Sequence, residues 1–242
     1  MNINKKLFQN LDLEGIVKKS IKTHFNNVEK DLPSDSKLDE SYVAEPKQFK
    51  QVSEFVSQKT KEAHINLYKE YIETLNKVSA ELDTADRTDV NSKHSDYRSL
   101  KLDETYNLNA TWLHELYFAN CFDPHSEIVM DSSAFIELQK YWGTFDDFQR
   151  DFMACALSSR NGWAVCGYNL YLKQLVNIFI DGHNQNIPVG FYPIIVVDMW
   201  EHASRDYLND KKSYLISQMR ELNWTAIEER VNKVKSIAQI LK

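Results

Sequence analysis

The hydrophobic pattern of this chain changes its period near residue 162, and that change limits the possible folds. Upstream, apolar residues recur at helical spacing, with no glycine or proline from Phe49 to Leu82. Downstream, three short branched or aromatic runs are separated by turns, at 162–168, 174–180 and 192–197. Helical spacing returns from Ser204. Helices followed by a small antiparallel sheet with flanking helices predict an α+β fold rather than a doubly wound parallel sheet.

The remaining pattern predicts two lobes in the main part of the chain. A helical hairpin domain is expected over residues 46–122, with a polar loop at 83–100 before a second helix at 109–119. An α/β domain with a three-stranded antiparallel sheet is expected over residues 123–242. Its helices are predicted at 135–158, broken near Gly143, and at 204–241, interrupted near residues 223–224.

Residues 1–45 are predicted to stand apart from this core. Apolar positions from Leu13 to Val28 form an amphipathic stripe, and the polar stretch that follows has the composition of a linker. Such a helix could dock on its own domain, on a partner or on a membrane surface. We favour docking on protein, because Glu14 and Glu29 keep the polar face from being markedly basic.

Composition excludes several classes of partner and location. The net charge of -6 argues against nucleic acid as the main partner. No apolar run reaches the ~18 residues that a membrane helix needs, and Met1 to Asn10 lack the apolar core of a signal peptide. The three cysteines are odd in number and lack metal-site spacing. These features predict a protein of the cytoplasm or another reducing compartment.

The end of the third apolar run carries the chemistry. Asp198 and His202 lie four residues apart directly after residues 192–197, so a carboxylate and an imidazole can face one metal ion. His64 and His114 lie within helical segments and can supply two more imidazoles. Three imidazoles and one carboxylate suit a first-row transition metal, iron and manganese among them.

Several segments resemble the iron/manganese superoxide dismutases. Asp198-Met199-Trp200-Glu201-His202-Ala203 is similar to the metal-binding signature of that family, and Gly162-Trp163-Ala164 resembles a strand whose Trp walls the metal pocket. Trp112 and the pair Tyr117-Phe118 flank His114 as in the family's second helix. The run from His183 to Gly190 resembles the actinobacterial branch, and Asn223-Trp224 fits as well. The resemblance covers about residues 58–242.

This resemblance implies a dismutase that converts superoxide anion to dioxygen and hydrogen peroxide at one iron or manganese ion per chain. The implied ligands are His64, His114, Asp198 and His202. The second-sphere donor would be His183, with Gln185 as second choice. Tyr71 would pass protons, with Tyr68 as the alternative, and Trp163 and Trp200 would exclude water and hold the ligands.

The chain also departs from the family pattern. His64 precedes Tyr71 by seven residues where eight are usual, so either the helix bulges or the ligand is misplaced. A second histidine of the early helix is absent, and Ser204 and Arg205 replace two tyrosines. In the family, that histidine and one of those tyrosines meet across a dimer interface. We therefore expect an altered homodimer, still joined through Glu201 and His202.

These departures leave a second hypothesis open. The chain could be a dismutase-like structural subunit of a larger assembly, docked through residues 1–45. A two-histidine, one-carboxylate iron oxygenase is disfavoured, because four ligands and the surrounding aromatics would crowd the open face that such a site needs.

Overall fold

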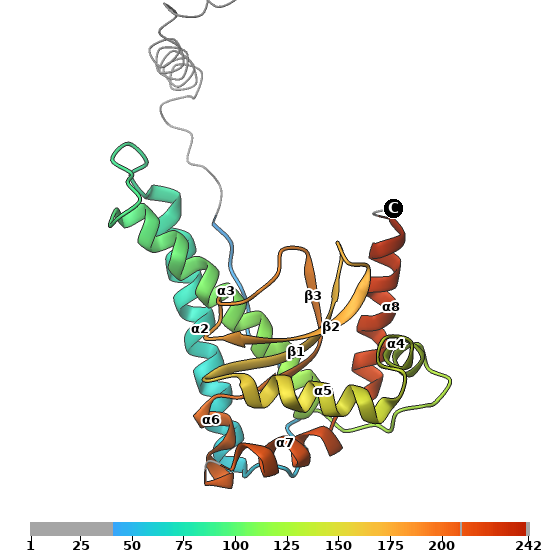
Figure 1. Cartoon of the computed structure of the whole chain (residues 1–242). Helices are drawn as coiled ribbons and strands as arrows, with labels where there is room; N and C mark the ends of the chain where they lie inside the picture. The colour runs from blue at the N-terminus through green and yellow to red at the C-terminus, as the bar shows by residue number, and fades with distance from the viewer. Residues whose placement is uncertain (1–40, 209, 241–242) are drawn as a thin grey trace, which may run out of the picture. The chain divides into compact units, whose positions relative to one another are not determined.

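The computed structural model describes residues 41–208 and 210–240, and it has the predicted α+β fold (Figure 1). The amphipathic helix predicted over 13–28, with nearly all of the 1–45 segment, lies outside the described residues. The described elements, in chain order, are α2 (Gln58–Thr84), α3 (Asp96–Cys121), α4 (Ser133–Trp142), α5 (Phe145–Ser158), β1 (Gly162–Asn169), β2 (Gln174–Asp181), β3 (Phe191–Asp198), α6 (Glu201–Ser204), the 3-10 turn η1 (Arg205–Tyr207), α7 (Lys211–Arg220) and α8 (Trp224–Ile240).

Three helix boundaries differ from the prediction. The last helical region, expected from residue 204, becomes a longer α-helix only at Lys211, after α6 and the turn η1. The first long helix begins at Gln58, where the side chain of Ser57 caps it by accepting from Thr60 N at 3.2 Å, so residues 49–56 are not helical. The second begins at Asp96 instead of residue 109, capped in the same way by Ser95. The prediction was late because the first turns of α3 are polar and largely exposed, so they carry no hydrophobic stripe.

The chain before α2 runs along the hairpin in an extended path. The side chain of Asn76 holds the backbone of Ala44, accepting from Ala44 N at 2.7 Å and donating to Ala44 O at 2.9 Å. Ser79 Oγ accepts from Tyr42 N at 2.9 Å. The described residues, from Ser41 onward, accordingly belong to one compact unit. A cut after residue 45 would remove these contacts, whereas a cut at residue 40 would keep them.

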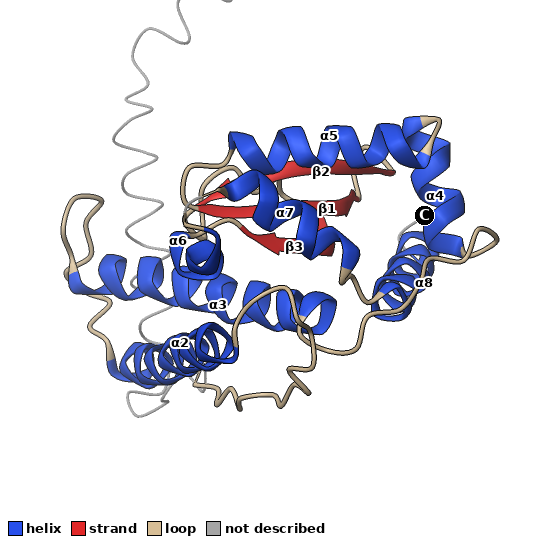
Figure 2. Cartoon of the chain, turned by 90° about the horizontal axis from the view of Figure 1, so that it is seen from below, coloured by secondary structure: helices blue, strands red, loops and turns tan. Residues whose placement is uncertain are grey.

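The sheet has the strand order β2-β1-β3, with both pairs antiparallel. Figure 2 shows it between α5 and the α2–α3 hairpin. Gly162 starts the central strand at a point where an added Cβ would lie 1.8 Å from Ile180 O, so only glycine fits there. The next residue, Trp163, pairs with Asp198 across β1 and β3. This register brings the predicted ligand and the predicted pocket wall to the same edge of the sheet.

Packing joins the hairpin to the sheet through α3, which contacts β3, while α2 contacts α6. The predicted break at Gly143 is confirmed, since this residue ends α4 with a φ of 81°. The predicted division into domains of 46–122 and 123–242 stays a prediction.

Cys121, Cys155 and Cys166 are free thiols. Among the described residues, every helix is too short or too polar to cross a lipid bilayer.

Candidate metal centre

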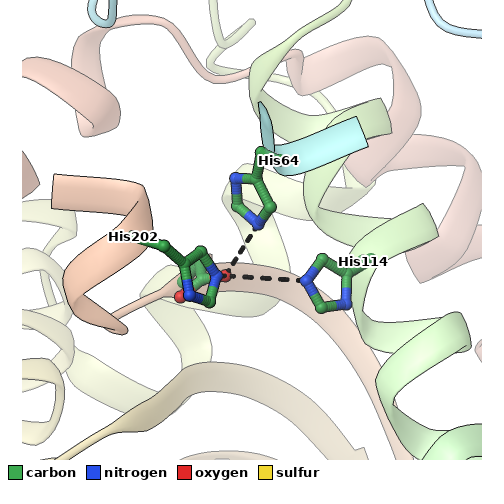
Figure 3. A group of neighbouring side chains, drawn as sticks. His64, His114 and His202 are labelled. Atoms are coloured by element: carbon green, nitrogen blue, oxygen red, sulfur yellow. Dashed lines mark hydrogen bonds and ion pairs between the residues drawn. The ribbon is translucent and has the colours of Figure 1, made fainter. Parts of the chain in front are cut away.

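Four side chains from four different elements converge on one point. They are His64 of α2, His114 of α3, Asp198 at the end of β3 and His202 of α6, and one potential ligand atom from each lies within 4.8 Å of all the others. Figure 3 shows the three histidines gathered around one carboxylate, with dashed lines from His64 and His114 to the same oxygen. Asp198 Oδ2 lies 3.1 Å from His64 Nε2, 3.3 Å from His202 Nε2 and 4.0 Å from His114 Nε2.

Local contacts explain why α6 meets the start of α2. The carboxylate of Asp206, four residues after His202, accepts from Ser57 N at 2.6 Å and from Thr60 Oγ1 at 3.0 Å. Tyr207 Oη donates to Phe55 O at 2.5 Å. These bonds fasten the segment after His202 to the first turn of α2. The rings of His64 and His202 consequently lie 4.7 Å apart between centroids.

The spacing of His64 needs no helix bulge. The backbone is α-helical without interruption over residues 58–84. Seven residues are almost two full turns of an α-helix, so His64 and Tyr71 share one face. His64 is also 2 % exposed and packs 5.1 Å from the ring of His114. Of the two possibilities raised by the sequence, the bulge and the misplaced ligand, neither is found.

The protonation states suit metal binding. Burial, with the neighbouring His64, sets the pKa of His114 well below its ordinary value, and burial likewise lowers the pKa of His64. Burial alone would raise the pKa of Asp198, but His202 and His64 hold it well below its usual range. At neutral pH these two buried imidazoles are therefore neutral and the carboxylate is ionised. Metals bind these groups in those forms.

Buried ring nitrogens provide a test of whether the residues fit a metal. His114 Nδ1 lies 2.6 Å from Ala110 O and must carry the hydrogen of that bond, so Nε2 presents a lone pair to the centre. His114 Nε2 is buried without a hydrogen-bond partner, and the buried His64 Nε2 faces only the Asp198 carboxylate, 3.1 Å away. Buried polar atoms seldom lack hydrogen-bond partners, and an unpaired polar atom in a native structure calls for an explanation such as a bound ion. The donor set therefore fits a transition metal.

A second group of predicted residues surrounds the centre. His183 is fully buried, and its Nδ1 accepts from Trp163 Nε1 at 3.0 Å while its Nε2 lies 3.2 Å from Tyr71 Oη. Burial lowers the pKa of His183 to about 4, so this ring is neutral at neutral pH. Burial also raises the pKa of Tyr71. The indole of Trp200 lies 5.6 Å from His183 and 5.9 Å from His202 between ring centroids.

The two fallback residues lie elsewhere. Gln185 is exposed in the turn after β2, where its backbone N–H bonds to Asp181 O. Tyr68 is buried, but its hydroxyl donates to Glu115 Oε1 at 3.0 Å and accepts from Lys47 N at 3.0 Å. The hydroxyl hydrogen of Tyr68 and a lone pair of its oxygen are therefore already engaged in hydrogen bonds. The geometry favours His183 over Gln185 and Tyr71 over Tyr68.

Two residues near the centre were missed by the sequence reasoning. The ring of Tyr106 lies 4.6 Å from that of His183, and Asn109 Nδ2 donates to His183 O at 3.0 Å. Both lie on α3, at or before the point where the second helix was predicted to begin. Tyr106 lies eight residues, just over two helical turns, before His114, so a correctly placed start of α3 would have put it near the face that carries this ligand. Asn109 lies five residues before His114 and well round the helix from it, and no sequence signal marked it.

Comparisons with known proteins identify the family of this chain. A sequence model described as iron/manganese superoxide dismutases, C-terminal domain, matches residues 132–230. The chain is 32% identical over 185 residues to "Superoxide dismutase [Fe]" of Aquifex aeolicus, covering 75% of this chain and 84% of the relative. It is 27% identical over 181 residues to "Superoxide dismutase [Mn]" of Mycobacterium avium, covering 73% and 84%. With "Superoxide dismutase [Mn/Fe]" of Aeropyrum pernix it shares 28% over 149 residues, covering 60% and 70%. The chain belongs to the iron/manganese superoxide dismutase family of enzymes.

Proposed function

We propose that this chain disproportionates superoxide anion at a single iron or manganese ion held by His64, His114, Asp198 and His202. The observation that carries the proposal is the convergence of these four groups, with the buried Nε2 of His114 lacking any hydrogen-bond partner. When bound, the ion would take an electron from one superoxide and return it to a second. Three neutral imidazoles and one carboxylate would leave a net charge of +1 or +2 on the centre, which attracts an anion.

The chain's own part in the reaction includes handling protons. The indole N–H of Trp163 can only donate, so Nδ1 of the neutral His183 must be the acceptor and the ring hydrogen must be on Nε2. That hydrogen faces Tyr71 Oη. Because the only ring hydrogen of His183 is directed at Tyr71, we assign to His183 the second-sphere role of holding and orienting that hydroxyl, and to Tyr71 the donation of protons that the product peroxide requires.

Two tryptophans complete the enclosure. Trp163 is fully buried and packs 4.8 Å from the ring of His114, while Trp200 stacks on His202. We assign to both the exclusion of bulk water and the positioning of these ligand rings. A dry surround strengthens the electrostatic interactions of the centre with its ligands and substrate.

The test of this function is metal content measured together with dismutase activity. We expect close to one equivalent of iron or manganese per chain, and activity that is lost on chelation and restored by one of the two metals. Reconstitution with each metal separately would also show which one supports turnover. A pure chain that binds neither metal would refute the proposal. A metal-loaded but inactive chain that co-purifies in a large complex would favour the structural subunit docked through residues 1–45.

We further propose a homodimer formed through Glu201 and His202. Glu201 is exposed, and the side chain of His202 keeps 21% of its surface accessible although it belongs to the metal cluster. Both line a pocket of about 500 Å³ together with Asn161, Trp200 and Arg205. A carboxylate from a second copy would bond the free nitrogen of His202, as metal-ligating histidines generally require.

Glu201→Gln is the variant that tests this interface. This substitution keeps the size of the side chain but replaces the anionic carboxylate that would accept the imidazole hydrogen with a neutral amide. We therefore expect the dimer dissociation constant to rise at least about tenfold. Sedimentation equilibrium over a range of concentrations measures this. Glu229→Gln, on the surface of α8, is the matched control and should leave association unchanged. An unchanged dimer in the Glu201→Gln variant, or a monomeric wild type, would contradict the proposal.

A further inference from the structure

Asn109 of α3 holds the turn that carries His183. Its Nδ2 donates to His183 O at 3.0 Å and to Asn184 Oδ1 at 3.0 Å. A backbone carbonyl can only accept a hydrogen bond, so the group of Asn109 that faces it must be the NH2. Both hydrogens of this amide are therefore engaged, and both bonds go to the turn between β2 and β3.

His183 is the last inward residue of that turn. The residue is fully buried, whereas residues 185–187 directly after Asn184 are exposed. A backbone hydrogen bond from Gln185 N to Asp181 O, 3.2 Å long, closes the turn around His183 without using the backbone atoms of His183 itself. Exposed turns have few contacts of their own to fix an inward side chain. The position of this ring therefore depends on contacts with other elements.

Three elements of the fold each hold one atom of His183. Trp163 of β1 donates to Nδ1 at 3.0 Å, and Tyr71 Oη of α2 lies 3.2 Å from Nε2. Asn109 of α3 donates to the carbonyl oxygen, so it fixes the main chain from which the ring extends. Only the torsions χ1 and χ2 separate that main chain from the ring. Holding the backbone and both ring nitrogens thus leaves the side chain a single conformation.

We propose that Asn109 is the positioning residue that keeps the ring hydrogen of His183 directed at Tyr71. The inference rests on the proposed function, because proton donation is assigned there to Tyr71. The hydrogen bonds of Asn109 go to the turn rather than to the four proposed ligands, so it acts through His183 and is not a catalytic residue. Without this amide the carbonyl of His183 would lose a donor. The turn would then relax toward solvent, and the ring would move away from Trp163 and Tyr71.

The first test uses the metal-free protein and does not depend on activity. The chain has five tryptophans, so a nitrogen–proton correlation spectrum contains five indole signals, and Trp163→Phe identifies that of Trp163. A hydrogen bond to the imidazole nitrogen of His183 moves this indole proton downfield. We expect Asn109→Ala to move the Trp163 signal upfield, because the acceptor has shifted, and to leave the other four in place. Circular dichroism checks that the variant is folded.

Asn109→Asp separates hydrogen bonding from the filling of space. Aspartate has the shape of asparagine but would set a carboxylate against two acceptor oxygens, so it should move the Trp163 signal at least as far as alanine does. A residue that merely fills space would tolerate this change. Asn107→Ala is the matched control, because Asn107 is buried on the same helix and donates within it, to Asp103 O at 2.7 Å. This control should leave the signal unmoved.

An unmoved Trp163 signal in either folded variant of Asn109 would overturn the proposal. If one of the two variants failed to fold, the other would decide. Movement of the signal in both variants, with the signal of Asn107→Ala at its wild-type position, would support the assigned role.

The second test compares metal content with turnover. We expect Asn109→Ala to keep the wild-type content of iron or manganese, because Asn109 is hydrogen-bonded to the turn and not to the ligands. Its kcat at saturating superoxide should fall by about tenfold, the lower end of the loss that follows when a residue supporting a site is removed. Asn107→Ala should match wild type in both measurements.

Wild-type kcat in the metal-loaded Asn109→Ala variant, or loss of its metal, would refute the role of Asn109. A metal-loaded wild type without dismutase activity would instead refute the proposed function. The Trp163 signal would still report in that case whether Asn109 positions His183, so the two failures can be told apart.

Discussion

Asp198→Asn is expected to yield a folded chain that retains almost no iron or manganese and has no measurable dismutase activity. Asp198 is fully buried, and its Oδ2 lies within 4.0 Å of all three histidine nitrogens. It is also the only anionic member of the cluster. The asparagine amide has nearly the same shape as the carboxylate but carries no charge. Its NH2 group cannot bind a metal. The loss of affinity should exceed the roughly 10–100-fold that follows when a residue merely supporting a ligand is removed.

Asp181→Asn provides the matched control. Asp181 ends β2 as Asp198 ends β3, but its carboxylate accepts from Arg160 N at 3.0 Å and lies outside the metal cluster. We expect this variant to bind metal as wild type does. Metal would be measured by mass spectrometry on both purified variants, with circular dichroism as the check on folding. Full metal occupancy in a folded Asp198→Asn variant would remove the basis of the proposed site.

Arg230→Leu is expected to lower the free energy of unfolding of the metal-free protein by about 3–5 kcal/mol. Arg230 is 8% exposed and joins α8 to two elements that carry ligands. It donates to Leu116 O at 3.2 Å and to Asn120 Oδ1, both on α3, and to Ile194 O of β3 at 2.8 Å. These acceptors are neutral. Leucine would remove this donor from Asn120 Oδ1 and Ile194 O, which are buried, and each such loss costs about 1–3 kcal/mol.

Urea unfolding followed by circular dichroism measures this change. Burial lowers the pKa of Arg230 to about 10, so the guanidinium remains charged at neutral pH and the measurement can be made there. Arg220→Leu, at the exposed end of α7, is the control and should change stability by no more than about 0.5 kcal/mol. A loss below about 1 kcal/mol in Arg230→Leu would mean that the three oxygens find other donors, such as water.

The sheet and most ligands could be predicted from local pattern. Strands β1, β2 and β3 begin and end within a residue of the predicted runs, because each is apolar and bounded by turns. Asp198 and His202 follow directly from the end of such a run. By contrast, the start of α3 was placed thirteen residues late, because its exposed polar turns are stabilised by backbone hydrogen bonds and a serine cap that leave no hydrophobic period. That error also left Tyr106 outside the predicted helix.

The amino-acid pattern established the α+β class, the order of the elements and the four residue types that make a transition-metal site, because these depend on local periodicity and on ligand chemistry. Tertiary packing alone settled whether His64 reaches that site. The α2 helix is regular, and the contacts of Asp206 and Tyr207 bring its first turns to His202. Packing likewise distinguished His183, buried between Trp163 and Tyr71, from Gln185, exposed two residues later. Spacing along a chain cannot show which side of a turn faces the interior, because burial is decided by elements distant in sequence.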